Sequence, residues 1–146
     1  MTAGSHADRA ERLARRALSQ ALWPPLAAIA VGVAAVANWP DTAWAGPFGW
    51  MAAGLAGASS LALIGFSALL VFDALLFRLA ASYEDEWKGG AAVDDILARM
   101  RLKPTPPKTR SLSDRAAGTR RIVSRQRMAL ALLTLSVCAP LLAAPA

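Results

Sequence analysis

The sequence predicts an all-α integral membrane protein with three transmembrane helices, and three observations lead to this fold class. First, the stretch from Pro47 to Leu79 carries only two ionisable side chains, Asp73 and Arg78. As a helix it would be about 50 Å long, against about 30 Å for the hydrocarbon core of a bilayer. Second, the 146-residue chain is 55% hydrophobic, and its apolar residues are grouped in blocks. Third, all 16 lysines and arginines lie within residues 9–16 or 78–127.

Residues 1–20 are predicted to form a basic N-terminal segment with an amphipathic helix from Ser5 to Gln20. Ser5 and Asp8 have capping-box spacing, and four arginines lie opposite the small and apolar side chains. Such a segment favours contact with a bilayer that has anionic headgroups, by about 1 kcal/mol for each arginine. The alternative is that these arginines are only a charged flank that sets the orientation of the first span.

Residues 21–39 form the first predicted span, which opens with Trp23, Pro24 and Pro25. Proline is tolerated at a helix start because its missing N–H would have no partner there. A cleaved signal peptide is the alternative, since two triplets of small-x-small form follow. The long charged region ahead and the position of the prolines favour a span. Residues 40–49 contain turn formers and tryptophan but no lysine or arginine, which predicts a short periplasmic loop.

The second span is predicted over residues 50–77 and carries small residues at helical spacing. Such rows allow the close backbone approach by which helices associate in lipid. The candidate packing residues are Ala53, Gly54, Gly57, Ala58 and Ala62 in this span, with Ala28 and Gly32 in the first. They predict an antiparallel hairpin of spans one and two.

Asp73 is the candidate functional carboxylate, because ionisable residues within membrane spans are commonly functional. If the span enters the bilayer at Trp50, about 20 helical residues cross the hydrocarbon core, which then ends near Leu70. Asp73 then lies at the cytoplasmic interface, which favours a structural role. Pairing with a basic residue of the following loop is the alternative.

Beyond the second span, the helix is predicted to continue as a cytoplasmic stalk through Tyr83 into the acidic residues 84–86 and to break at Gly89 and Gly90. Three consecutive acidic residues on a helix point in different directions. They therefore predict a solvated charge run, not a metal or catalytic site.

The basic cytoplasmic loop, residues 78–127, contains a predicted amphipathic helix over residues 93–102. Its apolar stripe has helical i, i+3, i+4, i+7 spacing and consists of Val93, Ile96, Leu97 and Met100. A helix of about ten residues is not stable alone, so the stripe must dock on the membrane surface, the stalk or another protein. We expect the partner contact here. Residues 103–111 follow as a semi-rigid, proline-rich linker.

Ser111 and Asp114 again have capping-box spacing, which predicts a helix from about Leu112 that leads into the third span, residues 128–146. Pro140 interrupts this span. Because the predicted inner segments hold every basic residue, the positive-inside rule predicts an N-terminus and a 78–127 loop in the cytoplasm and a C-terminus outside. The expected location is a bacterial inner membrane.

The sequence contains few residues for metal or covalent chemistry. It has one histidine, His6, and one cysteine, Cys138, and it lacks the phosphate-loop, dinucleotide, zinc-protease and paired-cysteine motifs. We therefore expect no cofactor and no metal. Nucleic acid is not an expected partner either, because the basic residues lie where topology requires them and no aromatic stacking platform accompanies them.

The string from Ser113 to Thr119 resembles the Asp-Arg-x-Ala-Gly-Thr motif that closes the RDD family of small membrane proteins. The similarity covers about seven residues, and in that family the motif follows the last span, whereas here a span comes after it. The size and the three-span arrangement are also similar to the small bacterial diacylglycerol kinases. Their carboxylates beside the spans have no counterpart in this chain, so that resemblance extends only to the outline.

These observations favour a non-enzymatic accessory, assembly or structural subunit of a bacterial inner-membrane complex, which engages other membrane protein subunits through its 78–127 loop. Two alternatives belong to other classes. One is a small homo-oligomeric, holin-like or transport protein. The other is a lipid-modifying enzyme that works at the cytoplasmic interface through Asp73 or the acidic residues 84–86.

Overall fold

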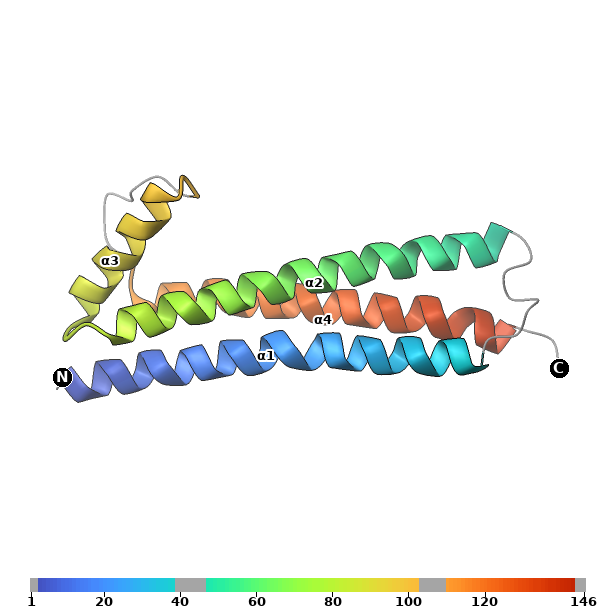
Figure 1. Cartoon of the computed structure of the whole chain (residues 1–146), viewed down its shortest axis with the longest axis horizontal. Coiled ribbons are helices and arrows are strands. Elements are labelled where there is room, and N and C mark those ends of the chain that lie inside the picture. The colour runs from blue at the N-terminus through green and yellow to red at the C-terminus, as the bar shows by residue number, and fades with distance from the viewer. Residues whose placement is uncertain (1–2, 39–46, 103–109, 144–146) are drawn as a thin grey trace. The chain divides into compact units, whose positions relative to one another are not determined.

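The computed structural model describes residues 3–38, 47–102 and 110–143, with side chains for residues 6–37, 47–102 and 110–139. Within these residues the chain is helical and has no strand. The four helices are α1 (Ala3–Asn38), α2 (Pro47–Ala81), α3 (Glu86–Arg99) and α4 (Leu112–Ala143) (Figure 1). Residues 40–46 of the predicted loop, 103–109 of the predicted linker and 144–146 of the third span lie outside the described residues.

Three of the helices, α1, α2 and α4, are long and apolar enough to cross a membrane. The segments that meet this criterion are His6–Ala37, Pro47–Ala81 and Leu112–Ala139. Large apolar side chains remain exposed on all three, including Val36 at 82%, Leu61 at 73% and Leu135 at 64% of their surface. The predicted all-helical fold with three membrane-length helices is therefore confirmed.

The first helix is longer than predicted. Residues 3–38 form one continuous helix, so Ser5 does not cap its start, and Pro24 and Pro25 lie inside it. A proline lacks the N–H that would bond to the carbonyl four residues earlier, so the carbonyls of residues 20 and 21 lose their helical donors. Prolines are tolerated inside membrane helices where neighbouring groups compensate.

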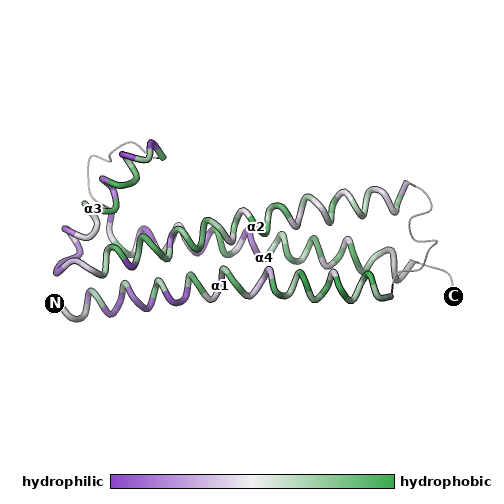
Figure 2. The backbone as a smooth tube through the Cα atoms, in the orientation of Figure 1, coloured by the Kyte–Doolittle hydropathy of each residue, from purple (hydrophilic) through white to green (hydrophobic). Residues whose placement is uncertain are grey.

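The described chain divides into two compact units, each made of helix segments that are distant in sequence. Unit 1 comprises Met1–Gln20 and Leu69–Ile122, and unit 2 comprises Ala21–Ala68 and Val123–Ala146. In α1 the boundary falls between Gln20 and Ala21, the two residues whose carbonyls lose their donors to the prolines. Polar residues concentrate in the segments of unit 1, whereas those of unit 2 are mainly apolar (Figure 2).

Unit 2 packs segments of α1, α2 and α4 around an apolar core. The buried core residues are Ala35, Leu63, Ala129, Leu133 and Val137. One amide is buried with them: the Gln126 side chain is fully enclosed, and its Nε2 donates to Ser67 Oγ over 2.9 Å. The polar pair joins α2 and α4 within a mainly apolar unit.

Unit 1 packs α3 against the first part of α1, the end of α2 and the first turns of α4. Its buried core consists of Ala10, Ala14, Phe77, Ala80, Val93 and Leu112. Val93 is completely buried, so the middle of α3 is part of the core of this unit.

The connection between α2 and α3 differs from the predicted stalk. Helix α2 ends at Ala81 and α3 begins at Glu86, so no helix runs through Glu84 and Asp85. Gly89 and Gly90 lie inside α3, both buried, and do not break it. A Cβ atom at Gly89 would lie 2.6 Å from the Ala80 carbonyl oxygen. Glycine is required here because the two helices approach too closely for a side chain.

A backbone cap ends α3 three residues before the predicted end. The Arg101 N–H donates to the Ala98 carbonyl over 3.0 Å, and the Leu102 N–H donates to the Leu97 carbonyl over 3.1 Å. Arg101 has a φ of 55°, in the left-handed region. Together these features form a Schellman motif, which typically brings the residue after the turn against the last helical turn.

Helix α4 begins at Leu112, where the Ser111 and Asp114 spacing predicts it. The Ser111 hydroxyl accepts a hydrogen bond from the Asp114 N–H over 3.2 Å. The same hydroxyl donates to the Asp114 carboxylate over 2.8 Å. The cap explains why the helix starts at this residue, because a free first-turn N–H group finds a side-chain acceptor.

We expect Gly89→Ala to destabilise unit 1 by about 1 to 3 kcal/mol, because the added methyl group must push α3 away from the Ala80 carbonyl. Thermal unfolding in mild detergent, combined with the rate of proteolysis within α3, measures the loss. Gly65→Ala is the matched control, since a Cβ at this helical position meets nothing within 4 Å. It should stabilise the chain by about 0.5 to 1 kcal/mol. Equal stability of the two variants would contradict the close approach.

Candidate functional site

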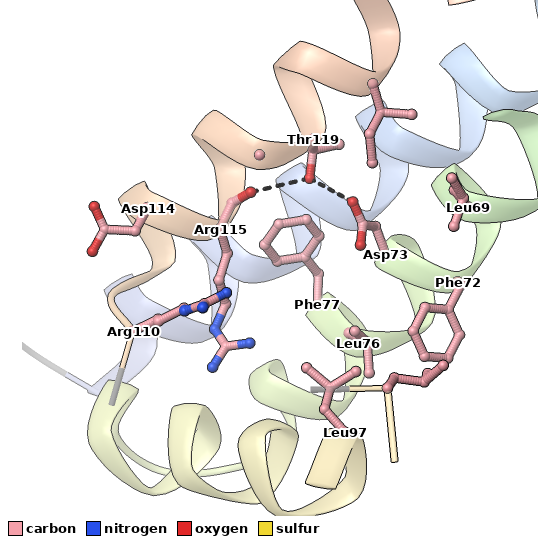
Figure 3. A pocket seen from close by; sticks show the side chains of 13 residues that line it. Leu69, Phe72, Asp73, Leu76, Phe77, Leu97, Arg110, Asp114, Arg115 and Thr119 are labelled. Carbon is pink, nitrogen blue, oxygen red and sulfur yellow. Dashed lines mark hydrogen bonds between the residues drawn. The ribbon is translucent and has the colours of Figure 1, made fainter. Parts of the chain in front are cut away.

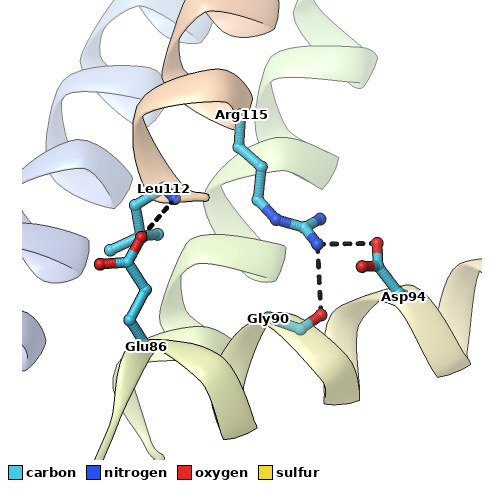
Figure 4. A network of polar contacts seen from close by, with 5 residues as sticks. All are labelled: Glu86, Gly90, Asp94, Leu112 and Arg115. Atoms are coloured by element: carbon cyan, nitrogen blue, oxygen red, sulfur yellow. Dashed lines mark hydrogen bonds and ion pairs between the residues drawn. The ribbon is translucent and has the colours of Figure 1, made fainter. Parts of the chain in front are cut away.

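A buried ion pair joins α3 to α4 in unit 1 (Figure 4). Arg115 Nη2 on α4 donates to Asp94 Oδ1 over 2.7 Å and to the Gly90 carbonyl of α3 over 3.2 Å. The two side chains are only 12% and 9% exposed. Arg115 Nε and Asp94 Oδ2 are buried without a partner among the described atoms. The two charges are therefore only partly compensated, by each other and by one carbonyl.

Glu86 makes a second contact between the two helices. Its Oε1 accepts a hydrogen bond from the Leu112 N–H over 2.8 Å, at the first residue of α4 (Figure 4). A carboxylate is favourable there, because the free N–H groups at a helix start carry partial positive charge. We call Glu86, Asp94 and Arg115, with their partners Leu112 and Gly90, the polar clamp.

The acidic cluster 84–86 divides into separate roles. Asp85 caps α3 by accepting a hydrogen bond from the Lys88 N–H over 2.7 Å. That hydrogen bond, followed by the attraction of the Lys88 ammonium group, lowers the pKa of the Asp85 carboxyl below its ordinary value. Glu84 lies 3.7 Å from the same ammonium group and is exposed. The three carboxylates do not converge on one point of the described chain, since Glu86 faces α4.

Asp73 is half-buried on α2 and faces α4 (Figure 3). Its Oδ2 accepts a hydrogen bond from the Thr119 hydroxyl over 2.9 Å, and that hydroxyl also lies 3.2 Å from the Arg115 carbonyl. The contact joins α2 to α4 one turn away from the polar clamp. One partner of Asp73 is therefore a hydroxyl of the segment 78–127.

A cavity of about 480 Å³ opens beside this hydrogen bond, between α2, α3 and α4 (Figure 3). We call it the unit 1 cavity. Its apolar walls are formed by Leu69, Phe72, Leu76, Phe77, Leu97, Leu102 and Ile122. Its polar lining consists of Asp73, Arg110, Asp114, Arg115 and Thr119, and Gly118 completes it. Apolar walls with a few convergent polar groups are the usual composition of ligand sites.

The predicted docking stripe of α3 is divided between the core and the surface. Val93 is fully buried in the core of unit 1 and Leu97 packs against that core, whereas Ile96 is partly exposed and Met100 is 55% exposed. Val93 cannot contact a partner, which corrects the prediction for this residue. The physical reason is that α3 docks on the chain's own helices through the side that carries Val93 and Leu97.

The predicted packing residues are also divided. Ala28, Gly32, Ala53 and Gly57 line one cavity of about 590 Å³ in unit 2. Ala62 packs against the core of that unit, while Gly54 and Ala58 are exposed.

The glycines among these residues make no close contact within the described chain. A Cβ at Gly32, Gly54 or Gly57 would meet nothing within 4 Å. The close approach expected at these glycines is therefore not formed among the residues that the structure describes.

Sequence reasoning did not identify the residues of the polar clamp or the buried Gln126. Glu86 looked like part of a charge run and Asp94 like the acidic start of an amphipathic helix. Arg115 was one of several arginines ahead of the third span. The resemblance of the string Ser113–Thr119 to a known motif could have drawn attention to Arg115 and Thr119, which both belong to it. Sequence spacing does not show which carboxylates these two side chains contact.

We expect Asp94→Leu alone, or Arg115→Met alone, to destabilise unit 1 by about 3 to 5 kcal/mol, because each leaves one buried charge without its partner. The double variant should recover most of that loss, since an apolar pair replaces both charges. A double-mutant cycle of thermal stability in detergent measures the coupling.

The exposed pair Asp95–Arg99, with side chains 56% and 78% exposed, provides the control for this cycle. Breaking it with Asp95→Leu should cost about 1 kcal/mol or less. If Asp94→Leu costs no more than Asp95→Leu, the polar clamp does not hold α3.

Four residues of the string that resembles the RDD motif, Asp114, Arg115, Gly118 and Thr119, line the unit 1 cavity. The likeness remains limited to that short string, and a membrane-length helix includes it and continues after it. The chain matches no protein-family model, no curated protein and no solved structure.

Proposed function

We propose that this chain is a non-enzymatic accessory subunit of a bacterial inner-membrane complex, anchored by α1, α2 and α4 and engaging a partner through the segment 78–127. The observation that carries the proposal is the polar clamp. Arg115 and Glu86 bind α3 to α4 through three hydrogen bonds, so α3 presents a fixed surface and not a flexible loop. A fixed surface lowers the entropic cost of association with a partner.

The bonding of the acidic residues supports a structural role over an enzymatic one. Asp85 and Glu86 accept hydrogen bonds at the starts of two helices, and Asp73 accepts one from Thr119. Glu84 lies exposed beside Lys88. A pair of carboxylates that shared one substrate would need to converge, whereas Asp85, Glu86 and Asp73 each bond to a different group, the Lys88 N–H, the Leu112 N–H and the Thr119 hydroxyl.

The partner surface that we propose is the exposed side of α3, represented by Ile96 and Met100. They are one helical turn apart and therefore lie on the same face of the helix. Met100 is 55% exposed, and Trp87, at the other end of α3, is 70% exposed. Exposed methionine and tryptophan are enriched at protein interfaces.

The distribution of charge supports the orientation that we propose. All 16 lysines and arginines precede α1's prolines or lie between Arg78 and Arg127. The positive-inside rule then assigns both segments to the cytoplasm and the C-terminus to the periplasm.

We expect the double variant Ile96→Glu/Met100→Glu to reduce partner recovery at least tenfold in a mild-detergent pulldown read by mass spectrometry, because two charges would be buried at the interface. Membrane abundance should stay unchanged, since neither residue belongs to the buried core of unit 1. Tyr83→Glu, an exposed aromatic position of the same unit outside α3, is the control and should retain the partner. Unchanged recovery with the double variant would refute docking through α3.

We expect a periplasm-active reporter fused after Ala146 to be active and the same reporter inserted after Lys88 to be inactive. The reason is the cost of moving the basic residues of the segment 78–127 across the membrane. Enzyme activity of the two fusions, normalised to their abundance, measures the topology. A cytosolic reporter at the C-terminus would overturn the proposed orientation.

A further inference from the structure

The α4 side of the unit 1 cavity changes from charged to apolar along its length. On α4 its lining runs from Asp114 through Thr119 to Ile122, a distance of about 12 Å along a helix. On α2 the lining runs from Leu69 through Asp73 to Phe77, so one carboxylate lies among apolar side chains. A ligand that fills this space therefore needs a polar head and an apolar tail.

The same grading is present in the helices that carry the cavity. Along α2, Asp73 is the first charged residue after the apolar run that begins at Pro47. Along α4, Arg127 is the last charged residue before an apolar run to Ala143. Both helices are long enough to cross a membrane. On α2 the cavity lies at the change from charged to apolar, around Asp73, and on α4 its lining ends at Ile122, five residues before Arg127. In a bilayer, such a change marks the level at which lipid headgroups meet acyl chains.

The charges that line the cavity balance. Arg110 and Arg115 are cationic, and Asp73 and Asp114 are anionic. Arg115 already bonds to Asp94 and to the Gly90 carbonyl. The Asp73 carboxylate accepts a hydrogen bond from the Thr119 hydroxyl. The Asp114 carboxylate accepts one from the Ser111 hydroxyl. Arg110 is exposed and forms no ion pair with any residue that the structure describes. A purely anionic or purely cationic ligand would meet a like charge here, whereas a zwitterion meets both signs favourably.

We propose that the unit 1 cavity binds one zwitterionic phospholipid of the phosphatidylethanolamine type. The phosphate pairs with the Arg110 guanidinium, and the ammonium group faces the carboxylates of Asp114 and Asp73. One acyl chain runs along Leu69, Phe72 and Ile122. The volume of about 480 Å³ is within the usual range of ligand sites and suits the head and upper chain of a lipid. This binding goes beyond the accessory role and does not depend on it.

Gly118 offers a sharp test, because it lines the cavity and a Cβ at this position meets nothing within 4 Å. Gly118→Leu should fill the space without straining the helix, since leucine is a better helix former than glycine. Native mass spectrometry of the full chain in detergent, titrated with phosphatidylethanolamine, measures the single-lipid adduct. We expect an apparent affinity about tenfold lower for Gly118→Leu. Gly65→Leu adds the same side chain at a helical glycine outside the cavity and should bind as the wild type.

Charge reversal at Arg110 gives a second test that does not depend on filling the cavity. Arg110→Glu should weaken the apparent affinity for phosphatidylethanolamine about tenfold. Arg121 is exposed and does not line the cavity, so Arg121→Glu is the control and should have no effect. Phosphatidylglycerol with the same acyl chains should bind less tightly than phosphatidylethanolamine, and water-soluble phosphoethanolamine should not bind at all. Equal or tighter binding of phosphatidylglycerol, or unchanged binding by both Gly118→Leu and Arg110→Glu, would overturn the proposal.

Discussion

Hydrocarbon offers no hydrogen-bond partner to a polypeptide backbone, and this constraint governs how the chain is built. A helix satisfies its N–H and C=O groups internally, and α1, α2 and α4 are long and apolar enough to use that solution. The non-helical backbone of the described chain, residues 82–85, 100–102 and 110–111, belongs to unit 1. There it is capped by Asp85, by the Schellman turn at Arg101 and by Ser111.

The same constraint explains why the two units are held together differently. Apolar helix faces gain little from meeting each other in lipid, so unit 2 relies on the fit of small and branched side chains and on the Gln126–Ser67 hydrogen bond. Unit 1 carries most of the charged residues and uses a buried ion pair and helix caps. Burying an ion pair is costly in free energy. What the buried pair does here is fix the position of α3, which is bonded to α4 at two points, through Arg115 and through Glu86.

The unit 1 cavity follows from these polar contacts. Arg115 is drawn toward Asp94 and Gly90, and Thr119 toward Asp73, so neither side chain fills the space between α2 and α4. Gly118 lies between them in the sequence and contributes no side chain. On the other wall, the Schellman turn brings Leu102 back beside Leu97. The residues that fix α3 are thus also those that leave a graded, partly apolar cavity beside it.

The amino-acid sequence by itself determined the helical class, the three membrane-length helices, the start of α4 at Leu112 and the separation of charged from apolar segments. These follow from periodicity, hydropathy and local capping, which act over a few neighbouring residues. Only the tertiary structure decided that Gly89 lies inside a helix, that Val93 is core and that Arg115 pairs with Asp94. Each of these depends on atoms about ten or more residues away, and sequence spacing carries no information about which distant groups meet.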